Sequence, residues 1–216
     1  MKKYFLLLII ITTTISINAQ ENRWGITAFG GLAIPTGGFS DFYNNGYTFS
    51  AGAIYDFKFS TRVAFTIGYT AWDLNQDEFN KSLAQDSVRF EGTAPVSTIP
   101  LLLQIKWYGT QEKLKLYGLI EAGFYFTKSE FSGDVFLADT LIGTISGKES
   151  GTNTGINLGI GLTYNLSENI EIDFATRYHI VSVKNTYNFS GITQSGNINS
   201  NQYWSLTAGV NIILFD

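Results

Sequence analysis

The sequence predicts an all-β fold, an eight-stranded antiparallel up-and-down barrel that spans a membrane. Three observations predict it. Eight stretches carry apolar residues at every second position, the connections between them alternate between long and short, and charged residues are only 15% of the chain. A surface exposed to water usually holds about 25–35% charged residues. Each stretch is long enough for a tilted transmembrane strand, which needs about 9–11 residues.

The first three strands are predicted at residues 24–35, 47–57 and 63–71. In each, large apolar side chains share one parity, whereas Gly, Ser and Thr fill most of the other. Successive side chains of a strand point to opposite faces, so each strand has an apolar face and a small or polar one. A Gly- and Asn-rich loop follows Pro35, and a very short connection separates the second strand from the third.

The clearest hairpin covers residues 99–107 and 116–127, joined by a tight polar turn. Apolar side chains alternate along both arms. Lys106 and Glu121 fall on the opposite parity. This arrangement is typical of a β-hairpin with one apolar and one mixed polar face.

The last three strands are predicted at residues 156–164, 170–183 and 204–214. The segments between the strands at residues 73–98, 129–153 and 184–201 are long and polar, and we expect them to form outer loops. Outer-membrane barrels have short periplasmic turns and longer external loops, so both termini are predicted to be periplasmic.

The N-terminus predicts export from the cytoplasm. Lys2 and Lys3 precede an apolar run at residues 4–11, and a more polar stretch leads to Ala19. This is the pattern of a signal peptide at residues 1–19, cut after Ala19, which leaves residues 20–216 as one barrel domain. A retained transmembrane helix would need about 20 apolar residues, more than this run contains.

Composition excludes several classes of protein. The chain has no Cys, which excludes disulfides and a lipid-modified N-terminal Cys, and its net charge of −4 gives no basic stripe for nucleic acid. A soluble lipocalin-like barrel would place its apolar parity inside and a charged parity in water. Here the second parity is mainly Gly, Ser, Thr, Asn and Tyr, which suits a narrow packed interior better.

The four Trp residues are predicted to be interfacial aromatics, because Trp is enriched where headgroups meet the hydrocarbon. Trp24 and Trp107 fall at predicted periplasmic strand ends, and Trp72 and Trp204 at outer ends. Trp72 has the inward parity, so we expect it to lie beyond the strand ladder.

Four segments carry a resemblance to a known family. They are Pro35-Thr36-Gly37-Gly38-Phe39-Ser40-Asp41, Ile99-Pro100-Leu101-Leu102-Leu103, Leu116-Tyr117-Gly118-Leu119-Ile120-Glu121-Ala122-Gly123 and the closing apolar strand. With them the chain resembles the small OmpA-like outer membrane protein beta-barrel domain family of Gram-negative bacteria. The resemblance implies an integral outer-membrane barrel without catalytic motifs. Its last strand resembles the C-terminal signal that the barrel-assembly machinery reads, although Asp216 rather than an aromatic residue ends the chain.

Five polar residues with inward parity form the predicted lumen plug: Lys106, Glu121, Asp173, Arg177 and His179. Charges in a narrow lumen need partners, because an unpaired buried charge is strongly unfavourable. We predict a salt bridge between Glu121 and Arg177 at mid-depth, with Lys106 and Asp173 nearer the periplasmic mouth. The alternative is that these charges gate a narrow pore, which the width of an eight-stranded barrel disfavours.

Catalytic and metal sites receive little support. His179 is the only histidine; Ser182 is three positions away and therefore on the opposite face, so no local catalytic pattern exists. Residues 73–77 match the start of a calcium loop, but Glu78 replaces the required Gly and Ala84 the bidentate Glu. No catalytic, cofactor-binding or metal residue is predicted.

The sequence therefore predicts a non-enzymatic integral outer-membrane barrel with a structural role or a surface-interaction role through its outer loops. Outer-membrane lipid, lipopolysaccharide and the barrel-assembly machinery are the expected partners, and the outer-loop partner is open. A narrow channel for small solutes and a lipid-modifying barrel enzyme remain as alternatives.

Overall fold

The computed structural model describes residues 23–57, 60–83, 88–109, 113–183, 186–189, 192–195 and 199–215. The predicted signal peptide at residues 1–19 lies outside these residues, so its cleavage after Ala19 stays a prediction. The elements in chain order are β1 (Arg23–Thr36), η1 (Gly37–Phe39), β2 (Gly46–Phe57), β3 (Thr61–Trp72), α2 (Gln76–Leu83), β4 (Val88–Thr93), β5 (Val96–Tyr108), β6 (Leu114–Leu137), β7 (Thr140–Asn165), β8 (Ile170–Val183), β9 (Thr186–Phe189), β10 (Ile192–Ser195) and β11 (Asn199–Phe215).

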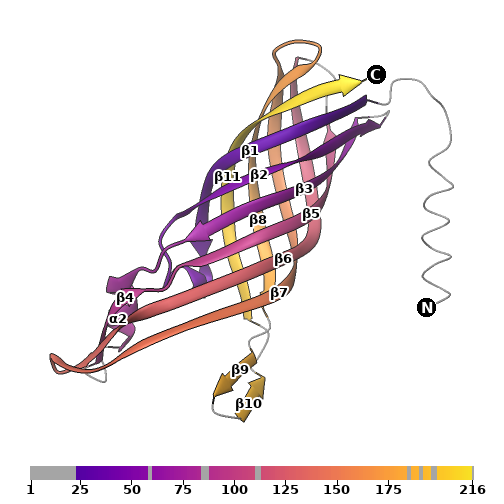
Figure 1. Ribbon diagram of the computed structural model, residues 1–216. Helices are drawn as coiled ribbons and strands as arrows, with labels where there is room; N and C mark the ends of the chain where they lie inside the picture. The colour runs from indigo at the N-terminus through magenta and orange to yellow at the C-terminus, as the bar shows by residue number, and fades with distance from the viewer. Residues whose placement is uncertain are drawn as a thin grey trace, which may run out of the picture.

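Eight long antiparallel strands close into a ring. The order is β6-β5-β3-β2-β1-β11-β8-β7, and β7 pairs with β6 to complete the barrel (Figure 1). The first strand and the last pair along their whole length, from Trp24 opposite Phe215 to Thr36 opposite Gln202. The predicted eight-stranded antiparallel barrel is therefore confirmed.

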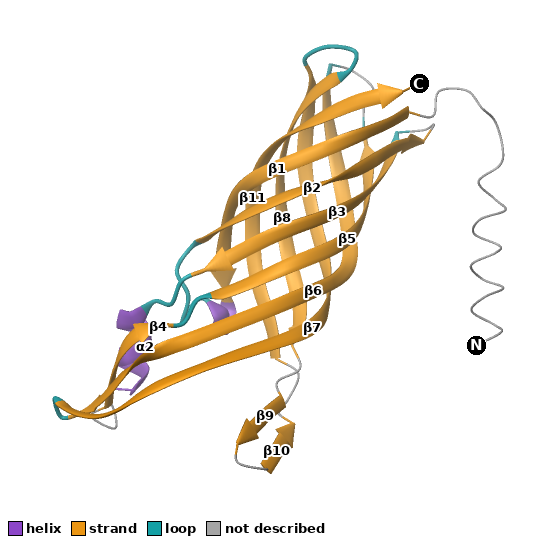
Figure 2. Ribbon diagram, in the orientation of Figure 1, coloured by secondary structure: helices purple, strands orange, loops and turns teal. Residues whose placement is uncertain are grey.

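The two ends of the barrel differ. We call the end that carries the short connections β2–β3, β5–β6 and β7–β8 the turn end, and the opposite end the loop end. The start of β1 and the end of β11 lie at the turn end (Figure 1). Helix α2 and strand β4 lie at the loop end (Figure 2). No helix in the described part of the chain has the length and apolar character needed to span a bilayer.

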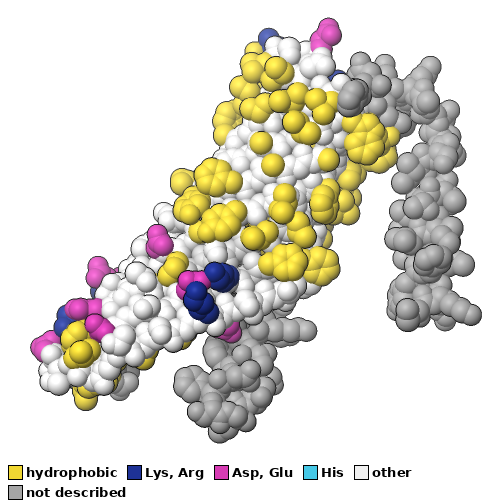
Figure 3. Space-filling view, in the orientation of Figure 1, with side chains coloured by type: hydrophobic (Ala, Val, Ile, Leu, Met, Phe, Trp, Pro, Cys, Tyr) yellow, Lys and Arg dark blue, Asp and Glu magenta, His cyan; other side chains and the backbone are white. Residues whose placement is uncertain are grey.

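The apolar parity of each strand faces outward. Ile26, Phe65, Leu103, Leu116 and Leu158 are all exposed on the barrel wall. Figure 3 shows apolar side chains spread over that wall, with charged side chains gathered towards the two ends. A soluble protein would not expose so much contiguous apolar surface, so the wall is built for lipid.

Pro100 lies inside the barrel wall, where proline is unusual because it cannot donate a ladder hydrogen bond. The register places it opposite Gly68, and direct pairing between β3 and β5 is interrupted there. A Cβ on Gly68 would come within 3.0 Å of the Pro100 ring and 2.8 Å of the Phe49 carbonyl. Gly68 therefore leaves the space that the Pro100 ring occupies.

The segment at residues 129–153, predicted as a polar loop, is instead a continuation of β6 and β7. The two strands stay paired up to Leu137 opposite Thr140, and the turn is made by Ala138 and Asp139, which both have positive φ. The prediction was wrong because polarity was taken as a sign of a loop, whereas Ser, Thr and Gly alternate here with Phe131, Val135 and Ile145 on one face. The hairpin therefore extends well beyond the barrel wall (Figure 1).

The other two predicted loops also contain regular structure. Residues 73–98 include α2 and β4, and β4 pairs with the extended part of β6. Residues 184–201 include the small two-stranded sheet of β9 and β10. We call α2, β4 and residues 130–153 of the β6–β7 hairpin the loop-end lobe.

Candidate functional site

The lumen contains all five residues predicted for the polar plug. Lys106 comes from β5, Glu121 from β6, and Asp173, Arg177 and His179 from β8, and each is buried. On each strand these residues alternate with apolar side chains that face outward, which accounts for their position in the lumen.

The predicted contact between Glu121 and Arg177 is present at mid-depth. Arg177 Nε lies 3.1 Å from Glu121 Oε1, an ion pair in which the N–H is not aligned for a hydrogen bond. Asn157 donates to the other carboxylate oxygen at 2.7 Å, and Gln104 also donates to Glu121. Arg177 donates through Nη1 to Thr207 at 2.7 Å. Each charge thus has a neutral polar neighbour besides its counterion.

A second ion pair lies one step closer to the turn end. Lys106 Nζ is 2.6 Å from Asp173 Oδ2, and both side chains are fully enclosed. Tyr117 donates a hydrogen bond to Asp173, and Asn211 donates to it at 3.3 Å. The register places Lys106 two residues nearer the turn end than Gln104, the partner of Glu121, which agrees with the predicted order along the lumen.

Sequence reasoning missed a third charged group at the turn end. Arg62 binds Asp56 through Nε at 2.5 Å and Glu171 through Nη1 at 2.7 Å, and Lys115 lies 3.1 Å from Glu171. Arg62 and Lys115 each fell one residue outside a predicted strand, because the strands were predicted too short. Glu171 shares the inward parity of Asp173, and that signal could have placed it in the lumen.

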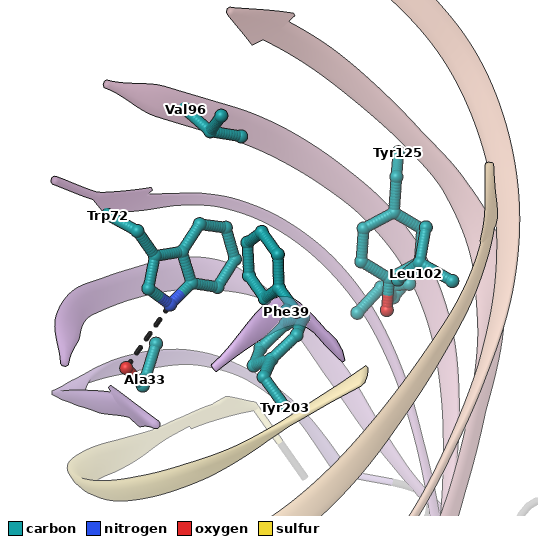
Figure 4. Close-up of a cluster of buried hydrophobic side chains, with 8 residues drawn as sticks. Ala33, Phe39, Trp72, Val96, Leu102, Tyr125 and Tyr203 are labelled. Carbon is teal, nitrogen blue, oxygen red and sulfur yellow. Dashed lines mark hydrogen bonds between the residues drawn. The ribbon is translucent and has the colours of Figure 1, made fainter. Parts of the chain in front are cut away.

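The lumen is filled at the level of the Glu121–Arg177 pair. The cavity beside this pair, lined by Thr66, Thr70, Tyr203 and Ser205 among others, has a volume of about 30 Å³. That is the volume of about one water molecule. At the loop end, four aromatic side chains belong to one buried cluster, which we call the aromatic cover: Phe39, Trp72, Tyr125 and Tyr203 (Figure 4).

Phe39 reaches this cluster because the chain turns sharply after β1. Gly37 has φ +60°, a conformation that side-chain-bearing residues rarely adopt, and it begins the short η1 turn that ends with Phe39. Phe39 meets Trp72 edge-to-face, with ring centroids 5.1 Å apart. The Gly37-Gly38-Phe39 sequence therefore supplies part of the aromatic cover.

Trp72 is not an interfacial aromatic, so that prediction was wrong. Its ring is buried inside the barrel, donates from Nε1 to the Ala33 carbonyl at 3.2 Å, and contacts Tyr203 (Figure 4). Trp72 still pairs with Val96 in the ladder, so its inward parity holds it in the lumen. Trp24 and Trp107 are exposed at the turn end and Trp204 towards the loop end; their contact with headgroups stays a prediction.

His179 has the distant partner that sequence spacing could not identify. Its Nε2 lies 2.8 Å from Ser205 Oγ, its Nδ1 lies 3.3 Å from the Tyr125 hydroxyl, and its ring stacks on Tyr203 at 4.1 Å. The register of β8 against β11 pairs His179 with Tyr203 and Arg177 with Ser205, so Ser205 is a diagonal neighbour of His179 on the same face. Both side chains are buried beneath the aromatic cover, which leaves no room for a substrate beside them.

No group of three or more His, Cys, Asp or Glu side chains suited to a metal ion occurs in the described ranges. The acidic segment that resembled a calcium loop leads into α2 instead, with Asp77 and Glu78 in the first helical turn. Acidic residues are favoured at that position by the helix dipole.

The closed ring, the apolar wall and the polar core define an integral membrane β-barrel. The chain matches the outer membrane protein beta-barrel domain family over residues 5–211 and belongs to that family. It is therefore an integral protein of the bacterial outer membrane, as predicted. A comparison with curated protein sequences gives no significant match.

Solved structures show the same fold at low sequence identity. Neisserial surface protein A and Ail, the attachment invasion locus protein of Yersinia pestis, the latter in complex with the heparin analogue sucrose octasulfate, are each 17% identical with a TM-score of 0.52. A major outer membrane protein of Thermus thermophilus is 11% identical with a TM-score of 0.51. Each alignment covers 90% of this chain and 100% of the other.

Proposed function

We propose that this barrel is non-enzymatic and that it holds an interaction surface, the loop-end lobe, outside the cell. Short turns of outer-membrane barrels face the periplasm, which puts the loop end and its lobe at the cell surface. One protein with the same fold, Ail, is named for attachment and invasion, which agrees with a surface role.

The observation that carries the proposal is the free edge of β7 in the lobe. Residues 154–165 of β7 pair with β8, whereas residues 140–153 pair with β6 alone among the described residues. Every second residue of such an edge presents an unpaired N–H and C=O, which can bind another strand. Leu141, Ile142 and Ile145 are exposed along it.

Photo-crosslinking in intact cells tests this proposal. A photoreactive amino acid at Ser146, on the free edge, should give discrete adducts with a partner protein. The same amino acid at Ile160, on the lipid-facing wall, is the control and should give none. The proposal fails if Ser146 gives no adduct, or if both positions give the same adducts.

We expect no steady single-channel conductance from the purified protein in planar bilayers. Four cations (Arg62, Lys106, Lys115 and Arg177) and four anions (Asp56, Glu121, Glu171 and Asp173) pair across the lumen at successive depths. An eight-stranded barrel has just enough interior for such side chains. A large porin in the same bilayers is the positive control. Reproducible unitary steps would favour the narrow channel instead.

The His179–Ser205 pair is the one observation that favours a lipid-modifying enzyme, since a serine nucleophile needs an adjacent base. Because the pair is buried, we expect Ser205→Ala and His179→Ala to leave lipid A and phospholipid profiles of expressing cells unchanged. Mass spectrometry of extracted lipids checks this. A profile that changes when the protein is expressed, and reverts in Ser205→Ala, would establish an enzyme.

Lipid and lipopolysaccharide are the partners that a wall in the outer membrane must contact. Recognition by the barrel-assembly machinery through β11 is part of the proposal. The apolar residues Val210, Ile212 and Leu214 face outward on this strand, which supports an accessible C-terminal signal.

A further inference from the structure

The loop-end lobe contains an apolar pocket with a volume of about 510 Å³. Eleven side chains of the described ranges line it, and all of these are apolar or aromatic. They come from the segment between η1 and β2, from Leu74 two residues before α2, from α2 itself, from β4 and its following residue Ala94, and from the β6–β7 hairpin. Small-molecule sites commonly have volumes of about 300–1,000 Å³ and mostly apolar walls.

Specific contacts hold the walls of this pocket in place. The Asn80 side chain of α2 pairs with Phe90 of β4 as a neighbouring strand would, accepting from its N–H at 2.8 Å and donating to its carbonyl at 2.9 Å. Gln76 donates to the same carbonyl at 3.0 Å. Phe79 meets both Phe42 and Phe90 edge-to-face, with centroids 6.1 and 5.7 Å apart. These hydrogen bonds and ring contacts fix the walls of the pocket relative to one another.

The pocket lies beyond the part of the barrel that faces hydrocarbon. β5 begins at Val96, which pairs with Ser129, and the pocket residues Phe131 and Val135 follow on the extended part of β6. Phe131 keeps 39% and Ile145 45% of its surface exposed. Apolar walls in water favour a ligand that covers them, because each Å² of apolar surface removed from water contributes about 25 cal/mol.

The chemistry of the walls limits the ligand. Among the residues that the structure describes, no charged side chain lines the pocket, so an ionic group would have to remain at its rim. Of these eleven residues, Tyr43 alone has a polar side-chain atom, and burial raises the pKa of its hydroxyl above the ordinary value, so it stays a neutral donor. At about 30 Å³ for each group the size of a water molecule, the volume accommodates about 17 such groups.

We propose that this pocket binds a medium-chain acyl group, an aliphatic chain of about twelve carbons with a hydrogen-bond-accepting head. A twelve-carbon acid has about fourteen heavy atoms, which is within the limit of about 17 groups that the volume sets. Its apolar body follows from the walls. A free fatty acid and a membrane lipid both carry this chemistry. The site is separate from the lumen and does not depend on strand binding at the β7 edge.

Photoaffinity labelling of the folded protein in lipid nanodiscs tests the proposal. One arm uses free dodecanoic acid with a diazirine on its chain, and the other uses a phospholipid carrying the same chain in the nanodisc. Peptide mass spectrometry should locate the label in α2 and β4, and excess unlabelled dodecanoic acid should suppress it. Labelling of the lobe by the free acid identifies a soluble ligand, and labelling only by the lipid identifies a chain drawn from the membrane.

Two variants give the matched comparison. Ile145→Glu places a carboxylate in the pocket wall and should lower lobe labelling about tenfold, because an acyl chain cannot pair with that charge. Ile142→Glu makes the same change three residues away, at a side chain that is 58% exposed and outside the pocket, and should leave labelling unchanged. Labelling confined to the lipid-facing strands, or the same labelling in both variants, overturns the proposal.

Discussion

Replacing Arg62 by alanine is expected to lower the free energy of unfolding by about 3–5 kcal/mol, the range found when one partner of a buried ion pair is removed. Arg62 is the counterion of two carboxylates, Asp56 and Glu171, and only 2% of its side chain is exposed. Without it, Glu171 keeps Lys115 and Asn211, whereas Asp56 keeps the more distant Arg23 at 3.5 Å. Asp56 is therefore the carboxylate that is left with the weaker compensation of its charge.

Urea titration of the protein folded in lipid vesicles measures this change, and the gel shift between boiled and unboiled samples reports the folded fraction. Arg23→Ala is the matched control, because Arg23 contacts the same carboxylate but is one-third exposed. Exposed ion pairs contribute at most about 1 kcal/mol. Equal effects of the two substitutions would show that burial does not strengthen the Arg62 cluster.

The barrel wall could be predicted because two simple signals agree along the whole sequence. Alternation of apolar side chains at residues such as Leu101, Leu103 and Ile105 fixes which face meets lipid, and the turn residues fix where each strand reverses. The extended β6–β7 hairpin could not be predicted in this way, because outside the membrane neither face needs to be continuously apolar. Outside the membrane, Ser, Thr and Gly are compatible with both strands and loops.

The sequence predicted which residues face the lumen, but only some of the contacts between them. Parity alone places Lys106, Asp173 and His179 inside. A partner on another strand depends on the stagger between strands, which a sequence pattern does not specify. For this reason, spacing along one strand could not predict the contact between His179 of β8 and Ser205 of β11. Trp72 shows the same limit, since its inward parity was recognised while the point at which the ladder ends was not.

The pair at mid-depth should respond unequally to changes in its two members. Arg177→Ala should lower the free energy of unfolding by about 3 kcal/mol, because it leaves the buried Glu121 carboxylate without its counterion. It also removes the guanidinium from the Phe29 ring, 5.0 Å away. Glu121→Gln should cost less, about 1–2 kcal/mol. The amide keeps the shape of the side chain, and the Arg177 cation keeps Thr207 and the Phe29 ring.

The same urea titrations measure both variants, with Glu130→Gln as the control. Glu130 forms ion pairs with Lys128 at 2.5 Å and Lys148 at 3.3 Å, but it lies on the outward face near the loop end. Solvent screens these exposed pairs, so this control should show no measurable change. Arg177→Met separates charge from packing because it keeps most of the side-chain volume. If Arg177→Met is as stable as the unmodified protein, the ion pair contributes nothing, and packing alone accounts for the effect of Arg177→Ala.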